Sequence, residues 1–100
     1  MATHLIHRAD TNAASIIAAL RCVGASVALI GQPVDLVVGF RGRNYLLEIK
    51  TRKGRPGARQ RAFFASWQGD ARIVRSAEDA LACIGAMRGW REEQDAADIS

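Results

Sequence analysis

The sequence has no long apolar run and no visible export signal. No segment approaches the roughly 18 to 20 consecutive apolar residues that a helix needs to cross a bilayer. The N-terminal stretch MATHLIHRAD lacks the basic-then-apolar order of a secretory signal. We therefore expect a cytoplasmic protein with no membrane partner.

Cysteine and histidine are scarce, with two residues of each. Cys22 and Cys83 have no second Cys or His at metal-ligand spacing, so the pattern is not that of a zinc motif. We expect both to be reduced thiols in the core. His4 and His7 have no third ligand nearby, so we expect no metal role for them.

The length of 100 residues suits one compact domain with a single core and is too short for two. We expect a core at about residues 10–88, with flexible ends at 1–9 and 91–100. The formal net charge is +4, and it is unevenly distributed. Residues 41–61 hold eight of the 14 basic residues against one acid, whereas acids outnumber bases from residue 62 onward. One face should be strongly positive, which favours nucleic acid as a partner, although a solvated surface is the alternative.

Hydrophobic spacing and turn residues predict the element order αβββαβα, an α/β (α+β, mixed-sheet) fold with helices flanking four strands. A first helix starts at Asp10 or Thr11 and closes at Gly24. Strands are expected at 25–30, on both sides of a hairpin turn, and at 71–75. A second helix should span 56–69, with Phe63, Phe64 and Trp67 as core residues or, alternatively, as a surface for unpaired bases. Ser76 should cap a third helix with a stripe of Leu81, Ile84 and Met87, and Trp90 should anchor the end of the domain.

The hairpin within PVDLVVGFRGRNYLLEIKTRKG, residues 33–54, can be put into register. If RGRN forms a tight turn with Arg41 opposite Asn44, then Asp35 stands opposite Lys50. Because side chains alternate between the two faces of a strand, Asp35, Glu48 and Lys50 share one face. The other face is apolar and consists of Leu36, Val38, Phe40, Tyr45, Leu47 and Ile49.

Two carboxylates and a lysine at one end of a hairpin suit a hard cation. Nearby carboxylates resist ionisation unless a cation lies between them, and oxygen ligands suit Mg²⁺ or Mn²⁺. Such ions keep waters, one of which can become a nucleophile, and Lys50 would position that water or stabilise charge on a phosphate. The combination predicts phosphodiester hydrolysis. The alternative is a surface ion pair between Glu48 and Lys50, with Asp35 at a turn after Pro33.

Three short motifs, PVD at 33–35, EIK at 48–50 and RQRAFF at 59–64, occur in this order. Together with their placement on the predicted elements, they resemble the PD-(D/E)XK nuclease superfamily. More narrowly, VDLVVGFRGRNYLLEIK followed by IVRSAEDAL is similar to small phage-encoded members close to the VRR-NUC and Holliday-junction-resolvase-like nucleases. The resemblance implies a restriction-endonuclease-like core, and a place in the host cytoplasm if the chain is phage-encoded.

The resemblance also implies roles for individual residues. Asp35 and Glu48 would bind Mg²⁺ or Mn²⁺ together with the backbone carbonyl of Ile49, with no small-molecule cofactor. Lys50 would be the catalytic lysine. Gln60 would be the motif glutamine that reaches toward the metal or the scissile phosphate.

One departure from the family pattern concerns the first helix. Many members carry a glutamate there as a further metal ligand, and the aligned position in this sequence is Ser15. Asp10 or Asn12 would then have to substitute through a water. Loss of this carboxylate would lower metal affinity, leave a one-metal site, or mean that the protein is inactive.

The basic loop after Lys50 predicts DNA binding. Gly54, Pro56 and Gly57 allow this loop to move or to follow a nucleic-acid backbone, and the next helix presents N-terminal amides that favour phosphate. We expect contacts that recognise backbone shape and not base sequence. The residues assigned to DNA are Arg41, Arg43, Arg52, Lys53, Arg55, Arg59 and Arg61.

Three functions stay open at this point. The first is a metal-dependent DNA endonuclease, selective for branched or four-way junction DNA and active as a homodimer. The second is a catalytically weak nucleic-acid-binding module that keeps the nuclease fold. The third is a phage structural or inhibitory protein that binds an acidic partner.

Overall fold

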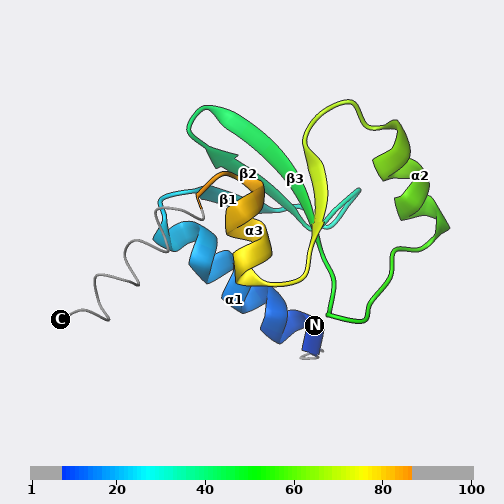
Figure 1. The fold of residues 1–100 in the computed structure, drawn as a ribbon, viewed down its shortest axis with the longest axis horizontal. Coiled ribbons are helices and arrows are strands. Elements are labelled where there is room, and N and C mark those ends of the chain that lie inside the picture. The colour runs from blue at the N-terminus through cyan, green and yellow to red at the C-terminus, as the bar shows by residue number, and fades with distance from the viewer. Residues whose placement is uncertain (1–7, 87–100) are drawn as a thin grey trace.

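A computed structural model of the protein describes residues 8–86, with side chains from residue 12 onward (Figure 1). The elements follow the order α1 (Arg8–Cys22), β1 (Ser26–Leu29), β2 (Leu36–Phe40), β3 (Arg43–Ile49), α2 (Ala58–Ser66), β4 (Ala71–Val74) and α3 (Ala77–Cys83). The predicted order αβββαβα is confirmed. The first helix begins at Arg8, two residues before the earlier of its two predicted starts.

The four strands form one mixed sheet in the order β1-β2-β3-β4. β1 and β2 are antiparallel, as are β2 and β3, whereas β3 and β4 are parallel. The parallel pair follows from the connection, because the chain must cross from one end of the sheet to the other between β3 and β4, and α2 lies in this crossover. The α+β class with a mixed sheet is therefore confirmed.

One face of the sheet packs against α1 and α3, which lie side by side in Figure 1. Ile16 and Leu20, four residues apart on α1, are fully buried there, as is Leu81 of α3. The predicted apolar face of the hairpin is the face that they cover. Its buried members are Leu36, Val38, Tyr45, Leu47 and Ile49, and Phe40 is half-buried.

The third helix begins as the sequence predicts. Ser76 has an extended backbone and its hydroxyl accepts a 3.0 Å hydrogen bond from the backbone N–H of Asp79. Glu78 and Asp79 lie in the first turn, where negative charge is favourable. Leu81 and Ile84 are buried, and Met87 lies outside the described residues.

The predicted hairpin register is wrong by two residues. Phe40 pairs with Arg43 and Leu36 with Leu47, so the turn consists of Arg41 and Gly42. Both turn residues have positive φ, 52° and 81°, as a type I′ turn requires, and this turn matches the twist of the two strands. Because the shift is an even number of residues, the division of side chains between the two faces is unchanged.

The prediction that α2 packs its aromatic residues into the core is wrong. No residue of α2 is buried, and the helix ends at Ser66, so Trp67 is its C-cap and 49% exposed. Phe63 and Phe64 are half-buried. In Figure 1, α2 stands apart from the layer formed by α1 and α3.

The prediction of core thiols is wrong for Cys22, whereas Cys83 packs against the core. Cys22 is exposed at the last residue of α1, and Cys83 is half-buried at the end of α3. Burial raises the pKa of the Cys83 thiol. Of the predicted flexible ends at 1–9 and 91–100, residues 8 and 9 instead belong to α1, and the rest lie outside the described residues, as do His4, His7 and Trp90. Within residues 8–86, no helix has the length and apolar character needed to cross a membrane.

Candidate active site

The open end of the β2–β3 hairpin brings Asp35, Glu48 and Lys50 together. Leu36 pairs with Leu47 in the antiparallel hairpin. Asp35, one residue before Leu36, therefore lies beside Glu48, one residue after Leu47. Lys50 follows the last residue of β3 and lies on the same side of the strand as Glu48, two residues before it. The neighbour across the strands from Asp35 is thus Glu48, not the predicted Lys50. The corrected register brings the two carboxylates closer than the sequence predicted.

Asp35 is held in place by backbone contacts. Its Oδ2 accepts a 2.7 Å hydrogen bond from the backbone N–H of Ile49, and its backbone oxygen accepts one of 2.9 Å from Ile30 N–H. The pKa of Asp35 is raised, mainly because burial removes water from the carboxylate. The Ile49 hydrogen bond lowers this pKa and the charge of Glu48 raises it, with a smaller lowering from Lys50. A cation placed between the two carboxylates would favour their charged forms and so oppose this increase.

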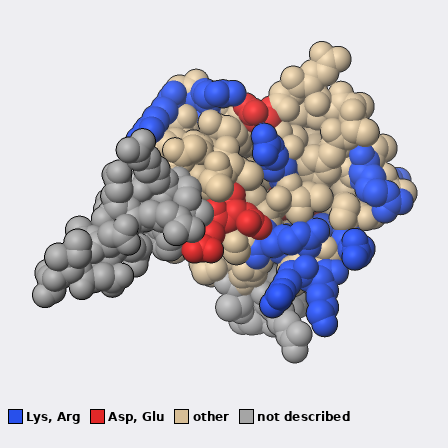
Figure 2. All heavy atoms as spheres, in the orientation of Figure 1, with Lys and Arg blue, Asp and Glu red and all other residues tan. Residues whose placement is uncertain are grey.

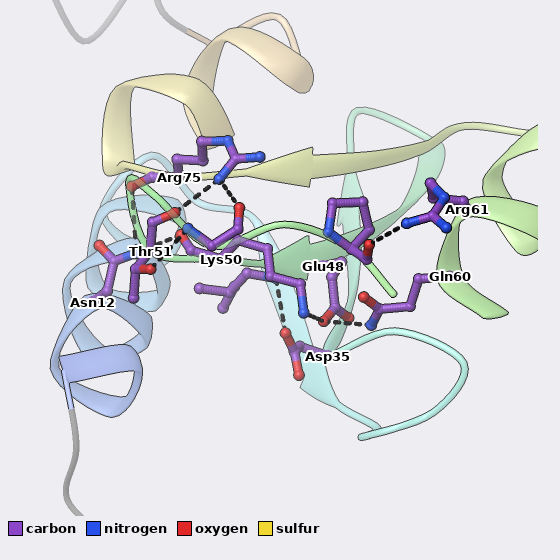
Figure 3. A network of polar contacts seen from close by, with 11 residues as sticks. Asn12, Asp35, Glu48, Lys50, Thr51, Gln60, Arg61 and Arg75 are labelled. Atoms are coloured by element: carbon purple, nitrogen blue, oxygen red, sulfur yellow. Dashed lines mark hydrogen bonds and ion pairs between the residues drawn. The ribbon is translucent and has the colours of Figure 1, made fainter. Parts of the chain in front are cut away.

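Glu48 is a buried charged residue with two donors. Its side chain is only 8% exposed, and its Oε2 lies 3.3 Å from Nζ of Lys50. The same oxygen accepts a 2.7 Å hydrogen bond from Nε2 of Gln60 on α2. Figure 3 shows the Lys50 and Gln60 side chains converging on Glu48 from different elements. The four residues assigned to catalysis therefore form one cluster, built from the start of β2, the end of β3 and α2.

A pocket of about 320 Å³ opens beside the two carboxylates. Asp35 and Glu48 line one part of it, and Ala13 and Ile17 of α1 line another. Among the described side chains of α1, those that reach this pocket are thus apolar. Ser15, the predicted position of a further carboxylate, is not among the residues that line this pocket.

Ser15, the aligned helix-one position, and Asn12, one of its two predicted substitutes, both bind backbone oxygens. Ser15 is exposed, and its hydroxyl donates a 3.1 Å hydrogen bond to the backbone oxygen of Asn12. The side-chain amide of Asn12 donates to the backbone oxygens of Lys50 (3.1 Å) and Arg75 (3.3 Å). Asn12 is therefore a brace between α1 and the ends of two strands, which corrects the expectation that it acts at the metal. The side chain of Asp10 lies outside the described part.

The donor set fits a hydrated divalent cation. Among the described residues, the N–H donors that contact the Asp35 side chain use Oδ2, and those that contact the Glu48 side chain use Oε2. The second oxygen of each carboxylate is therefore available to a ligand. The backbone carbonyl of Ile49 is the third predicted ligand. Within the described residues, no three His, Cys, Asp or Glu side chains lie together so that they could hold a metal ion. Two carboxylates, one carbonyl and several waters match the way in which proteins bind Mg²⁺.

A half-buried arginine orders the basic loop that follows Lys50. Arg75 comes directly after β4, and because Ile49 pairs with Val74 in parallel, Arg75 lies beside the start of this loop. Its guanidinium donates to the backbone oxygen of Thr51 (2.8 Å) and to that of Gly54. Arg75 and Thr51 lie together in Figure 3. The loop therefore has a fixed backbone, while Arg52, Lys53 and Arg55 are exposed on it.

The seven basic residues assigned to DNA fall into two groups. Arg52, Lys53 and Arg55 lie on the loop at the site, and Arg59 and Arg61 are exposed on α2 next to Gln60. Figure 2 shows several clusters of basic side chains on one face of the molecule. Arg41 and Arg43 lie instead at the hairpin turn, roughly 20 Å away along the strands.

The two turn arginines have local partners. Nη2 of Arg43 lies 3.1 Å from Oδ2 of Asp70, and the Arg41 guanidinium lies 4.8 Å from the centre of the Phe40 ring. The turn is thus separate from the Asp35–Glu48 cluster. The structure does not bring all seven basic residues to one place.

Sequence reasoning missed the roles of Asn12 and Arg75. Both lie at the end of the sheet where Lys50 lies, and both bind backbone oxygens there. A signal for Arg75 exists in the sequence, since parallel strands end at the same edge and place the residues that follow them close together. No comparable signal identifies Asn12, because its contacts join segments that are 38 and 63 residues away in the chain.

Comparison of the chain with protein-family models, with curated proteins and with solved structures finds no match.

Proposed function

We propose that this protein is a divalent-cation-dependent endonuclease that hydrolyses phosphodiester bonds in DNA. The observation that carries the proposal is the cluster of Asp35, Glu48, Lys50 and Gln60 at the edge where the basic loop begins. Buried carboxylates are costly unless paired, and this pair lies beside an open pocket. Chemistry on an anionic substrate accounts for both the cluster and the arginines and lysine around it.

Each residue of the cluster has a distinct task in this proposal. Asp35 and Glu48, with the carbonyl of Ile49, hold Mg²⁺ or Mn²⁺, which supplies a water of lowered pKa and neutralises charge on the phosphate. Lys50 is oriented by Glu48 and stabilises the negative charge that develops on the phosphate oxygens. Gln60 holds the Glu48 carboxylate from the side of α2 and is placed to contact the substrate.

The basic loop supplies the affinity for DNA. Arg52, Lys53 and Arg55 present their charges to phosphates beside the cluster, while Arg75 keeps the loop backbone in place. Contacts of this kind recognise the shape of the backbone, which suits a structure-selective enzyme acting on branched or four-way junction DNA. A homodimer would present two such sites to one branched substrate.

A second candidate is a nucleic-acid-binding module of the same fold without strong catalysis. The observation that favours it is the apolar character of Ala13 and Ile17, which line the pocket where a further carboxylate would help to hold the cation. With two acidic ligands and one carbonyl, the affinity for Mg²⁺ would be low.

The test combines cleavage and binding on labelled four-way junction, flap, duplex and single-stranded DNA, in Mg²⁺, Mn²⁺ or EDTA. The proposal predicts metal-dependent cutting that falls at least about a hundredfold in Glu48→Gln while DNA binding is kept or tightened. Glu78→Gln, which changes an exposed acid on α3, is the matched control and should cut like the wild type. Binding without cutting in either metal would favour the second candidate.

A further inference from the structure

α2 carries an aromatic surface that the core of the protein does not use. The rings of Phe63 and Trp67 lie 5.2 Å apart between centroids and are tilted by 32°, and Phe64 meets Phe63 edge-on at 5.3 Å. No residue of α2 is buried, and half of Trp67 is exposed. The Trp67 ring lies close to the backbone at Gly69, and part of it faces solvent.

A second pocket, here called the α2 pocket, lies between α2 and the segment that precedes β2. Its volume is about 470 Å³, within the range of small-molecule binding sites, and its lining includes Pro33, Arg59, Gln60 and Phe63. Gly31 lines both this pocket and the pocket of the two carboxylates. Gln60 is a second link between the two pockets, because it lines the α2 pocket and its amide donates a hydrogen bond to Glu48, which lines the other. The α2 pocket is therefore adjacent to the candidate active site.

The chemistry of the α2 pocket fits an unpaired nucleobase. An aromatic ring offers a stacking partner to any base, and an arginine at the rim attracts the adjoining phosphate. A base inside a duplex is covered on both faces by its neighbours, so only an unpaired base can use such a ring. We infer that the α2 pocket binds an unpaired nucleobase next to the phosphate at Asp35 and Glu48, so that the protein prefers DNA with unpaired nucleotides to continuous duplex. This inference rests on the proposed function and names its substrate class.

Affinity measured in EDTA tests the inference without any need for cleavage. In a Trp90→Phe background, Trp67 is the sole tryptophan, and its fluorescence reports a base on the aromatic surface. Titration uses an oligothymidylate of about 12 nucleotides, a blunt duplex of equal length, and the same duplex with a short single-stranded gap. We expect the oligothymidylate and the gapped duplex to quench Trp67 fluorescence strongly, and the blunt duplex to quench it weakly.

Variants at Phe63 separate stacking from general affinity. Phe63→Leu should weaken binding of the oligothymidylate and of the gapped duplex by about tenfold, and that of blunt duplex by less than about twofold. Phe63→Tyr should restore the wild-type affinities because it keeps the ring. Phe64→Leu is the matched control on the same helix, since the Phe64 ring touches Phe63 but does not line the α2 pocket and instead lines a different pocket with Arg61 and Ile73.

The inference would be overturned if Phe63→Leu lost affinity equally for all three DNAs. It would also be overturned if Phe63→Leu and Phe64→Leu had equal effects on DNA affinity. Loss of a dimer in Phe63→Leu with unchanged DNA affinity would also overturn it, because the aromatic surface would then belong to a contact between copies of the chain. A preference for unpaired DNA in a wild type that cuts nothing in Mg²⁺ or Mn²⁺ would support this inference and contradict the endonuclease proposal alone.

Discussion

The side-chain amide of Gln60 donates a 2.7 Å hydrogen bond to Oε2 of Glu48, the oxygen that also lies 3.3 Å from Nζ of Lys50. This contact ties α2, which buries none of its own residues, to the end of β3. Oε2 of Glu48 therefore contacts Gln60 and Lys50, and the other oxygen is available to a ligand in the pocket that Glu48 and Asp35 line. The position of α2, and with it that of Arg59 and Phe63, depends in part on the residue at the centre of the site.

The raised pKa of Asp35 predicts a pH dependence of stability in the absence of metal. Between the ordinary pKa of 3.8 and the raised value, the folded protein holds the proton more tightly than the unfolded chain does. The free energy of unfolding contributed by Asp35 is therefore fully present below pH 3.8 and is lost as the pH rises through the folded pKa. Asp35→Asn has no carboxylate to ionise, so this loss of stability with rising pH does not occur in the variant. Its amide oxygen can still accept the hydrogen bond from Ile49 N–H.

Urea unfolding in EDTA over a pH series measures this effect. At acidic pH the variant and the wild type should have similar stability, and toward neutral pH Asp35→Asn should become the more stable of the two. Glu78→Gln, at an exposed position, is the control. A difference between Asp35→Asn and wild type that stays constant over the whole pH range would contradict the prediction.

Arg75 is predicted to keep the basic loop ordered. Arg75→Met removes the donors to the backbone oxygens of Thr51 and Gly54, and charge-assisted bonds of this kind contribute about 1.5–3 kcal/mol each. We expect trypsin to cut the variant after Arg52 or Lys53 at least about tenfold faster than the wild type. Arg72→Met changes an exposed arginine three residues earlier and is the control. Equal rates of loop cleavage in both variants would show that Arg75 does not hold the loop.

DNA binding should depend on salt through the loop and not through the hairpin turn. Each phosphate contact adds about 0.9 to the slope of log affinity against log salt concentration. Lys53→Gln and Arg55→Gln should each reduce this slope by about that amount. Arg41→Gln, at the far end of the hairpin, should leave it unchanged. Equal reductions by all three variants would place the DNA over the whole length of the hairpin.

The hairpin turn offers a test of backbone strain. Arg41 has a φ of 52°, a conformation that costs an ordinary side chain about 1 kcal/mol and suits asparagine better. Arg41→Asn gives up the contact with the Phe40 ring, worth about 0.5 kcal/mol at an exposed site. We expect a net gain of about 0.5 kcal/mol in the free energy of unfolding, measured by urea denaturation. Arg43→Asn, outside the positive-φ pair, should bring no gain.

The sequence predicts the element order and the buried face of the hairpin because both depend on local periodicity. Leu36, Val38 and Leu47 alternate with polar or less buried neighbours, and an even shift of register leaves this alternation intact. The register itself depends on which two residues form the turn. RGRN allows either Gly42–Arg43 or Arg41–Gly42 at its centre, and the pattern of apolar residues is the same for both.

The tertiary contacts of α2 could not be predicted from the sequence. Phe63, Phe64 and Trp67 have the spacing of a buried stripe, but periodicity does not say whether a partner surface exists. In the structure α2 is placed by a polar contact, Gln60 with Glu48, and its aromatic residues stay half-buried or exposed. The clustering of Asp35, Glu48 and Lys50 was predictable because the three residues lie at the same end of two adjacent strands.

Single-turnover cleavage of supercoiled plasmid over a series of Mn²⁺ concentrations tests the central claim most directly. The account predicts a rate that rises with Mn²⁺ to a plateau, is absent in EDTA, and falls at least about a hundredfold in Glu48→Gln prepared in parallel. Cleavage that persists in EDTA, or that proceeds at the wild-type rate in Glu48→Gln, would show that Asp35 and Glu48 are not the site of phosphodiester hydrolysis.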